Sequence, residues 1–426
     1  MAEPGTDLCV RACHLIVSEG VPGWSCRRVA GLRKGRGMRI RSSRGVVALA
    51  VAGMLTGSAI AAAAPASAAP VLAQSWSQVR FLGERTIPQY SEFRGTTVGG
   101  LSGIDRDKRT GQWVMISDDR SDRQAARFYT AEIDVDGGGV HDVRFTGTKP
   151  FLRPDGQVYP PSSAGDGTTV DPEDIRVDPW TGKYWWSQEG NRPRGTPTPT
   201  DPVIQPSLQR AGRDGAYAGE LPLPQNYKIT TGETGPRRNL VLEAMTFAAG
   251  GALLTSAVES PLLQDGPVPT PDHGGLSRVT VHTRAGTTLA QYAYPQEPLF
   301  AATNPPGSFA DSGIPEILAH PTDPTRYLVI ERGYVTGHGY NVKLFEMSTR
   351  GATNIKNVDA LAGTTVTPVG KKLLLDFRDL PLPLIDNYEG MSWGPALPTG
   401  ERTLLVVSDD NFWPGENTRF VALAIR

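Results

Sequence analysis

The sequence repeats itself five times at a nearly constant spacing. The similar segments begin at Gly99, Glu173, Glu243, Glu316 and Glu389, so the steps between them are 74, 70, 73 and 73 residues. Four steps this similar are not expected by chance, and a regular period is the signature of a repeat architecture. The chain is therefore expected to fold as a series of equivalent units rather than as unrelated domains.

Each unit carries the signals of β-strands. Its opening segment is followed by a turn with Gly or Pro and by a second run rich in Val, Ile, Leu, Trp and Tyr, a pattern typical of a β-hairpin. Two further strands follow in most units, whereas residues 191–215, rich in Pro, Thr and Arg, are interpreted as a long loop. Four strands per unit predict an all-β fold, a single β-propeller of five four-stranded units. A six-bladed ring, with a degenerate blade in the long second unit, is the alternative.

Only three strands can be recognised in the last unit. Residues 77–87, which precede the first unit, can supply the fourth by pairing with residues 419–425. This pairing would place the N- and C-terminal strands in one blade and close the ring, so that neither strand is left as an exposed edge.

The first 68 residues have a different character. Residues 38–44 are positively charged, residues 46–64 are apolar and rich in Ala, and residues 66–69 are small, which is typical of a secretory signal peptide cleaved near Ala68. The alternative is a membrane anchor, but the apolar core is weak and a cleavage pattern follows it. We therefore expect an unstructured upstream segment (1–37), a signal peptide (38–68) and an extracellular propeller domain (69–426).

The predicted mature chain has no cysteine and an excess of acidic residues. Cys9, Cys13 and Cys26 all precede it, so it can form no disulfide. Residues 69–426 carry 34 Lys and Arg against 41 Asp and Glu, which does not suit a nucleic-acid partner. They also contain no apolar run long enough to span a membrane. We expect a monomer.

Carboxylates recur where the first two strands of each unit should meet. The first strand should line the channel and the second should run antiparallel to it, so the start of one and the end of the other share one mouth. Four first strands open with a glutamate: Glu173, Glu243, Glu316 and Glu389. The second strands end with further acids: Asp118, Asp119, Glu189, Glu259, Glu331, Asp409 and Asp410.

So many carboxylates at one mouth would repel one another and raise each other's pKa. Oxygen ligands without Cys or His suit Ca²⁺, so a bound calcium ion would relieve the repulsion. The alternative is that each glutamate hydrogen-bonds the backbone of a neighbouring unit and has a purely structural role.

These motifs resemble those of the phytase-like family of secreted bacterial proteins, also called the family with esterase-like activity of phytase. The resemblance rests on residues 99–105, 116–120, 172–175, 186–190, 242–245, 330–332, 387–392 and 405–411, and it covers residues 78–426. It implies a propeller whose Glu and Asp residues form the site. This sequence has Gly99 where the other repeats have Glu, so its acidic ring is not symmetric.

Two functions fit this pattern. One is a Ca²⁺-dependent phosphoesterase acting on a small phosphorylated substrate, with the four opening glutamates as catalytic residues and the seven other acids as metal ligands. Basic residues adjacent to the acids would bind phosphate: Arg120, Arg192, Arg332 and His338. The other is a non-catalytic, Ca²⁺-stabilised propeller that binds a partner in the cell envelope or outside the cell.

The segment Gly390-Met391-Ser392-Trp393-Gly394 matches the nucleophile-elbow pattern of serine hydrolases. That motif needs a strand, a sharp turn and then a helix, whereas here it falls within a repeat strand with no helix behind it. A serine nucleophile is therefore not expected.

Overall fold

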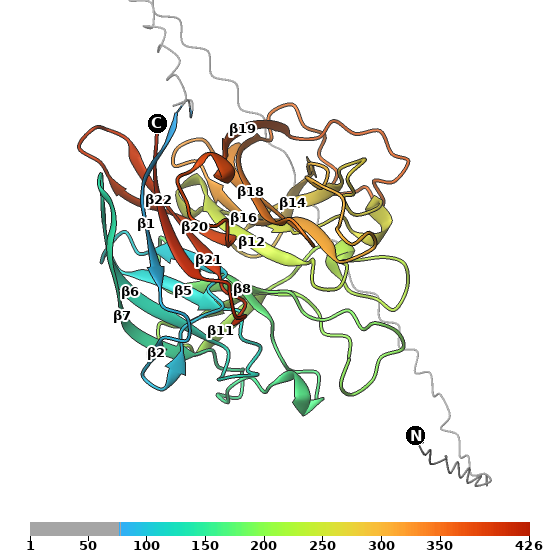
Figure 1. Cartoon of the computed structure of the whole chain (residues 1–426). Coiled ribbons are helices and arrows are strands. Elements are labelled where there is room, and N and C mark those ends of the chain that lie inside the picture. The colour runs from blue at the N-terminus through green and yellow to red at the C-terminus, as the bar shows by residue number, and fades with distance from the viewer. Residues whose placement is uncertain (1–75, 77) are drawn as a thin grey trace, which may run out of the picture. The chain divides into compact units, whose positions relative to one another are not determined.

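Five antiparallel four-stranded sheets account for nearly all the secondary structure of the computed structural model (Figure 1), which describes Trp76 and residues 78–426. The predicted upstream segment and signal peptide lie outside the described residues. The five sheets are the blades of a β-propeller, as the repeat predicts, and the six-bladed alternative is wrong.

The blades follow one another along the chain. Blade one contains β4 (Gly103–Arg106), β5 (Trp113–Ser117), β6 (Arg127–Asp136) and β7 (Gly139–Pro150). Blade two contains β8 (Pro172–Val177), β9 (Tyr184–Gln188), β10 (Ser207–Ala211) and β11 (Tyr217–Leu221). Blade three contains β12 (Leu242–Ala248), β13 (Leu253–Val258), β14 (Leu276–Thr283) and β15 (Thr288–Pro295). Blade four contains β16 (Ala310–Ala319), β17 (Arg326–Val335), β18 (Gly339–Ser348) and β19 (Gly370–Asp376).

Blade five is built from both ends of the described chain. It contains β20 (Asn387–Ala396), β21 (Arg402–Asp409), β22 (Thr418–Ile425) and β1 (Val79–Ile87). β1 pairs antiparallel with β22 from Val79 opposite Ile425 to Ile87 opposite Thr418, and Figure 1 shows the blue and red strands side by side. The predicted closure of the ring is therefore confirmed.

The remaining elements are short. β2 (Glu92–Phe93) and β3 (Thr96–Thr97) form a small hairpin. The described residues form five 3-10 turns: η1 (Ser162–Ala164), η2 (Gln225–Tyr227), η3 (Ala249–Gly251), η4 (Leu263–Asp265) and η5 (Phe377–Asp379). No helix in this part of the chain has the length and hydropathy needed to cross a membrane.

One sequence interpretation is wrong within blade two. The segment 191–215, interpreted as a loop, contains the whole of β10, which pairs with β9 on one side and β11 on the other. Leu208 and Ala211 of β10 are buried in the core, so a short strand with only two apolar anchors is held by its neighbours. The Pro- and Thr-rich composition belongs to the residues that precede it.

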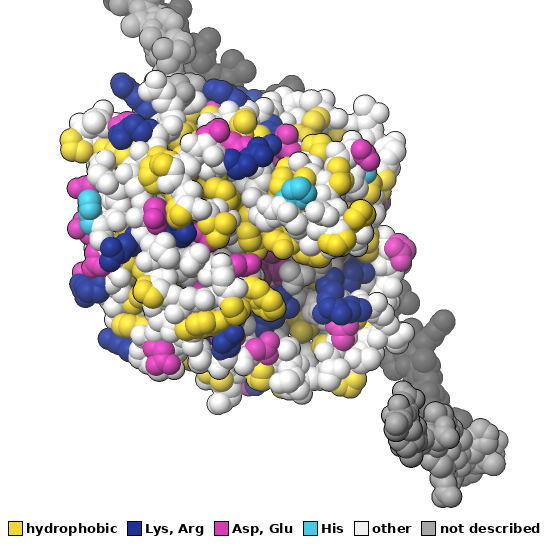
Figure 2. All heavy atoms as spheres, in the orientation of Figure 1, with side chains coloured by type: hydrophobic (Ala, Val, Ile, Leu, Met, Phe, Trp, Pro, Cys, Tyr) yellow, Lys and Arg dark blue, Asp and Glu magenta, His cyan; other side chains and the backbone are white. Residues whose placement is uncertain are grey.

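The first strand of each blade lines the central channel, and each of these inner strands contacts the next around the ring. The core lies between adjacent blades, so strands such as β5, β8, β9 and β22 are buried on both faces, whereas the outer strands β7, β11 and β19 are partly exposed. For example, Trp186 of β9 stacks on Phe151, which follows β7, with ring centroids 4.3 Å apart. On the face shown in Figure 2, Lys and Arg side chains are interspersed with Asp and Glu.

Candidate functional site

One mouth of the channel opens into a pocket of about 470 Å³ that is lined chiefly by carboxylates. We call it the acidic pocket. Its acidic lining comes from all five blades: Asp118, Glu173, Glu243, Glu259, Asp311, Glu389, Asp409 and the loop residue Glu416. The inner strands β8, β12 and β20 each present one glutamate here, because the backbone bulges at that residue in the pairing with the second strand.

Two groups of carboxylates, which combine Glu173, Glu243 and Glu259 of the acidic pocket with the adjacent Asp171 and Glu189, lie close enough together to hold a metal ion. Asp171, Glu173 and Glu189 form one, and Glu189, Glu243 and Glu259 form the other; within each, the ligand oxygens lie within 4.8 Å of one another. Glu189 belongs to both. The groups therefore join blade two to blade three.

Glu173 and Glu243 are the least compensated members of these groups. Each is only 8 % exposed, and serine hydroxyl groups donate to their backbone carbonyl groups, but neither carboxylate receives a hydrogen bond from an amide, hydroxyl or cationic group of the described residues. Instead, the carboxyl group of Glu173 faces Asp171 and that of Glu243 faces Glu189. Asp118 Oδ1 is likewise buried without a hydrogen-bond partner. Oxygen atoms of this kind fit a hard cation such as Ca²⁺.

Two arginines offset part of the negative charge. Arg332 Nη2 donates to Glu259 and Glu389 at 3.1 and 3.0 Å, and its Nη1 donates to Asp311 at 3.1 Å. Arg120 forms an ion pair with Asp171 at 2.7 Å. Each of these arginines is already paired within the described residues, so the pocket keeps an excess of carboxylates.

Because the carboxyl groups of Asp171, Glu173 and Glu243 are buried close together, their pKa values are raised. Burial raises the pKa of Glu173 and Glu243 well above the usual range of a carboxylic acid, and the neighbouring carboxylates raise it further. Burial also raises the pKa of Asp171 to about 7, although Arg120 opposes this shift. At neutral pH these groups can all be charged together only if a cation enters the pocket; without one, some of them keep a proton.

Glu316, predicted to belong to the same ring, lies elsewhere. In β16 the backbone bulge precedes it, so Glu316 takes the position that Asp174 holds in β8, one residue deeper in the channel. There it forms an ion pair with Arg176 and accepts a hydrogen bond from the Met391 amide at 3.2 Å. The structure thus separates Glu316 from the other three opening glutamates.

Three of the predicted metal ligands point away from the acidic pocket. Successive side chains of a strand face opposite sides, so when Asp118 and Asp409 face the pocket, Asp119 and Asp410 do not. Asp119 binds Arg127 at 2.6 Å and the amides of the following loop, and Asp410 accepts a hydrogen bond from the Gly100 amide at 2.8 Å. Glu331 is bound by Lys371 and by Tyr294 at 2.7 Å.

Of the four predicted phosphate-binding residues, Arg120 and Arg332 line the acidic pocket and the other two do not. Arg192 donates to the carbonyl groups of Thr230, Gly232, Thr234 and Pro236, so its guanidinium holds a neighbouring loop. His338 is exposed in a turn and packs against Phe300 with ring centroids 6.4 Å apart.

The sequence analysis did not single out Asp171, Asp311, Asn387 or Glu416. Asp171 and Asn387 stand two residues before Glu173 and Glu389, so alternation along the strand could have identified them. Asn387 donates to Glu389 at 2.9 Å, and its Oδ1 has no hydrogen-bond partner. Asp311 and Glu416 carry no comparable signal, because β16 is longer than the other inner strands and Glu416 lies in a loop.

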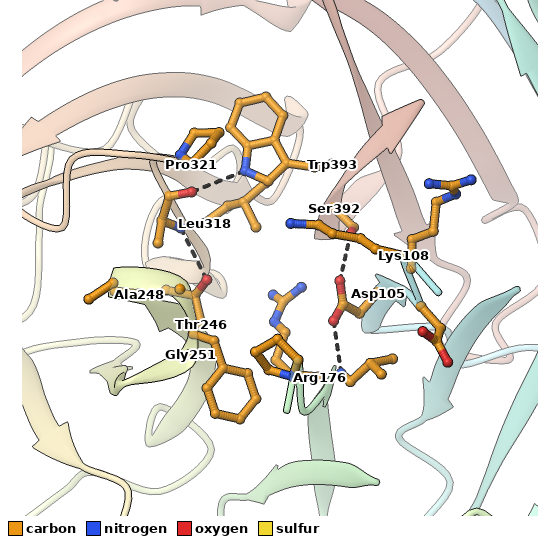
Figure 3. Close-up of a pocket in the computed structure, with 18 of the residues that line it drawn as sticks. Asp105, Lys108, Arg176, Thr246, Ala248, Gly251, Leu318, Pro321, Ser392 and Trp393 are labelled. Atoms are coloured by element: carbon orange, nitrogen blue, oxygen red, sulfur yellow. Dashed lines mark hydrogen bonds between the residues drawn. The ribbon is translucent and has the colours of Figure 1, made fainter. Parts of the chain in front are cut away.

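The opposite mouth of the channel has a different chemistry (Figure 3). It holds a pocket of about 220 Å³ with apolar walls that include Leu318 and Trp393. Asp105 accepts hydrogen bonds there from Ser392 Oγ at 2.8 Å and from the Val177 amide at 2.8 Å. Ser392 is thus held by a carboxylate within β20. None of the predicted site residues lines this mouth.

Arg176 of blade two lies between the two mouths and contacts each of the other four blades. Nη1 donates to the Ile104 and Met391 carbonyl groups at 2.8 and 3.0 Å, Nε donates to the Met245 carbonyl at 2.6 Å, and Nη2 pairs with Glu316. Those partners come from blades one, five, three and four. Arg176 therefore closes the middle of the channel.

The chain is similar to one known protein family and, more remotely, to several solved structures. The family model described as "Phytase-like: Esterase-like activity of phytase" matches residues 96–412. No curated protein sequence matches the chain.

The structural similarities are weak. Hydrazine synthase of Kuenenia stuttgartiensis is 12 % identical, with a TM-score of 0.34 over 75 % of this chain and 81 % of the other. A periplasmic gluconolactonase of Pseudomonas aeruginosa is 12 % identical, with a TM-score of 0.33 over 78 % and 89 %. A protein of unknown function from Dyadobacter fermentans is 13 % identical, with a TM-score of 0.37 over 82 % and 99 %.

Proposed function

Because the chain belongs to the phytase-like family, which is described by the esterase-like activity of phytase, we propose that it is a cation-dependent ester hydrolase that cleaves small phosphoric esters. The observation that carries this proposal is the acidic pocket, where Glu173 and Glu243 are buried among carboxylates without a compensating donor. An acidic pocket alone would repel a phosphate group, so the proposal requires a bound cation, for which we propose Ca²⁺.

The two carboxylate groups that share Glu189 would hold the cation. Calcium, when bound there, would offset the negative charge and polarise a phosphoryl oxygen. Glu189 also accepts a hydrogen bond from the Val241 amide at 2.6 Å, which fixes its carboxylate between blades two and three. Of the residues predicted as ligands from the sequence, Glu189 and Glu259 belong to these groups, and Asp118 and Asp409 line the acidic pocket from blades one and five.

Glu389 is the residue we assign to proton transfer. Its carboxylate is 7 % exposed and is oriented by Asn387 and by Arg332, which also contacts Glu259 of the second carboxylate group. Glu389 would therefore accept a proton from the attacking water beside the cation. Arg332 would hold Glu389 in place and balance part of its charge.

Hydrolysis of a panel of esters tests this proposal. We expect the purified protein to hydrolyse phosphomonoesters or phosphodiesters in the presence of Ca²⁺ and to lose this activity in chelator. Glu389→Gln should lower kcat about 100-fold or more, and Glu243→Gln should weaken the dependence on Ca²⁺. Glu132→Gln, on the outside of blade one, is the matched control and should retain full activity. Hydrolysis that is unaffected by chelator, or the absence of any phosphoesterase activity, would refute the proposal.

A non-catalytic role is the second candidate, and one observation favours it. The group of Glu189, Glu243 and Glu259 bridges blades two and three, so a cation there would brace the ring without any turnover. Stabilisation by Ca²⁺ in a protein that hydrolyses none of the esters would support a Ca²⁺-stabilised binding module.

We also propose that the protein is exported and that cleavage near Ala68 leaves the propeller outside the cytoplasm. The intact mass of the exported protein tests this proposal. A product that retains residues 38–64 would contradict it.

A further inference from the structure

Aromatic side chains stand on one side of the acidic pocket. Phe309, Tyr334, Tyr340 and Trp413 line it together with the carboxylates. Trp413 is 66 % exposed and Phe309 is 64 % exposed, which makes them the two most exposed large hydrophobic side chains in the described part of the chain. Exposed apolar groups that gather at one pocket mark a binding surface, whereas the same groups scattered singly need no explanation.

The rings of Phe309, Tyr334 and Tyr340 form a row. The centroids of Phe309 and Tyr334 are 6.1 Å apart, and those of Tyr334 and Tyr340 are 5.0 Å apart. The Phe309 carbonyl accepts hydrogen bonds from the amide and hydroxyl groups of Thr336, at 3.1 and 2.7 Å. The exposed ring of Phe309 therefore projects from a fixed backbone.

Trp413 is anchored in a similar way. Its amide donates to the Asp410 carbonyl at 2.7 Å, and its own carbonyl accepts a hydrogen bond from Gln89. The loop that carries it is tied to the row of rings because Glu416 accepts hydrogen bonds from Tyr340 at 3.1 Å and from Asn411 at 2.8 Å. The aromatic surface is thus placed before any ligand arrives, which reduces the entropy lost on binding.

The charges of the pocket limit the polar part of the ligand. Arg120 and Arg332, the two arginines of its lining, are already paired with Asp171, Glu259, Asp311 and Glu389. A ligand with several phosphate groups would place most of them against carboxylates. A single anionic group on the cation, attached to an apolar ring, matches both parts of the pocket.

We propose that Phe309 and Trp413 select a ligand in which one phosphoryl group carries a flat, apolar ring. This inference rests on the proposed function, because the phosphoryl group requires the cation. It goes further by assigning the substrate class: monoesters or diesters of an aromatic or otherwise apolar cyclic alcohol, rather than densely phosphorylated polyols.

Equilibrium binding of two compounds that cannot be hydrolysed tests the inference. Benzylphosphonate and methylphosphonate carry the same anionic group and differ in the ring. In the presence of Ca²⁺, isothermal titration calorimetry should give a Kd for benzylphosphonate about tenfold lower than that for methylphosphonate. Trp413→Ala and Phe309→Ala should each bring the ratio of the two Kd values toward one.

Trp180→Ala is the matched control, because Trp180 is 59 % exposed and follows β8, at the other end of its blade. It should leave the ratio unchanged. Equal affinities, binding of neither compound, or a ratio that survives both substitutions would overturn the inference. Because no turnover is needed, a tenfold preference in a protein without phosphoesterase activity would refute the proposed reaction and keep the aromatic site.

Discussion

At the scale of single residues, Arg176 of blade two joins the whole ring, because it bonds to residues of each of the other four blades. It is buried, it pairs with Asp174 and Glu316, and it donates to carbonyl groups of three inner strands. Replacing one partner of a buried ion pair leaves the other charges uncompensated in a medium of low polarity. The stability of the whole ring therefore depends on this one guanidinium.

We predict that Arg176→Met lowers the free energy of unfolding by about 3–5 kcal/mol. Urea denaturation measures it. Arg144→Met is the control: Arg144 and its partner Glu132 are 60 % and 64 % exposed, and such a pair contributes less than about 1 kcal/mol. Equal losses in the two variants would contradict the role assigned to Arg176.

A second prediction at this scale concerns His282 of β14. Burial lowers the pKa of His282 to about 4, from an ordinary value of 6.5. Between these values the unfolded chain binds a proton that the folded protein excludes. The contribution of His282 is therefore complete above pH 6.5 and is lost as the pH falls toward 4, by up to about 3 kcal/mol.

The free energy of unfolding, measured at pH 7 and at pH 4.5, checks this. His282→Gln should show a smaller difference between the two pH values than the unmodified protein. His273→Gln, at an exposed position before β14, should behave like the unmodified protein. Parallel pH profiles for all three proteins would show that His282 does not titrate as described.

The candidate site could be predicted from the sequence only in part, for reasons visible at particular residues. Glu173, Glu243 and Glu389 were found because the repeat marks them. Glu316 was misplaced by one residue because a bulge has no signal in the sequence. Asp119 and Asp410 were assigned to the pocket because strand alternation was not applied to adjacent acids. Glu331 was assigned to it as the end of a second strand, but β17 continues to Val335, and Arg332, the residue after Glu331, faces the pocket instead.

At the scale of elements, β1 covers what would otherwise be the open edge of β22. Strand edges pair readily with other chains when they are exposed. We predict that a chain starting at residue 91 loses the cooperative unfolding transition and aggregates, whereas a chain starting at Ala69 does not. Thermal unfolding followed by circular dichroism, together with light scattering, measures both effects. A cooperative, monomeric product from the shorter chain would contradict this view of β1.

The strands themselves were predictable because period and turn residues mark them, with β10 as the exception. The segment 349–369 was not predictable in the same way. It leaves blade four and lies along β15 of blade three, where the Ile355 amide donates to the Gln291 carbonyl at 2.8 Å and the Val369 amide to the Ala293 carbonyl at 3.0 Å. Such a contact between blades depends on the closed ring, so no local pattern in the sequence reveals it.

At the scale of the whole molecule, the acidic pocket should couple cation binding to folding. A ligand that binds only the folded state stabilises it by about 2.7 kcal/mol at a hundredfold excess over its Kd. We predict that chelator lowers the Tm, that added Ca²⁺ restores it, and that Glu243→Gln reduces this response. Differential scanning calorimetry measures the shift, with Glu132→Gln as the control. A Tm that does not respond to chelator or to Ca²⁺ would leave the carboxylate groups without a cation.

The pairing of β1 with β22 also sets the order in which the protein can be completed during synthesis. Of the described strands, β1 is the first to leave the ribosome and β22 is the last, so β1 must wait unpaired while four blades are made. Contacts between residues so far apart in sequence are slow to form, and strands that wait for a partner are prone to aggregation. A nascent chain that stops short of β22 therefore cannot form a smaller propeller. Such a chain leaves the edge of β1 unpaired, because the partner of β1 in the closed ring is β22.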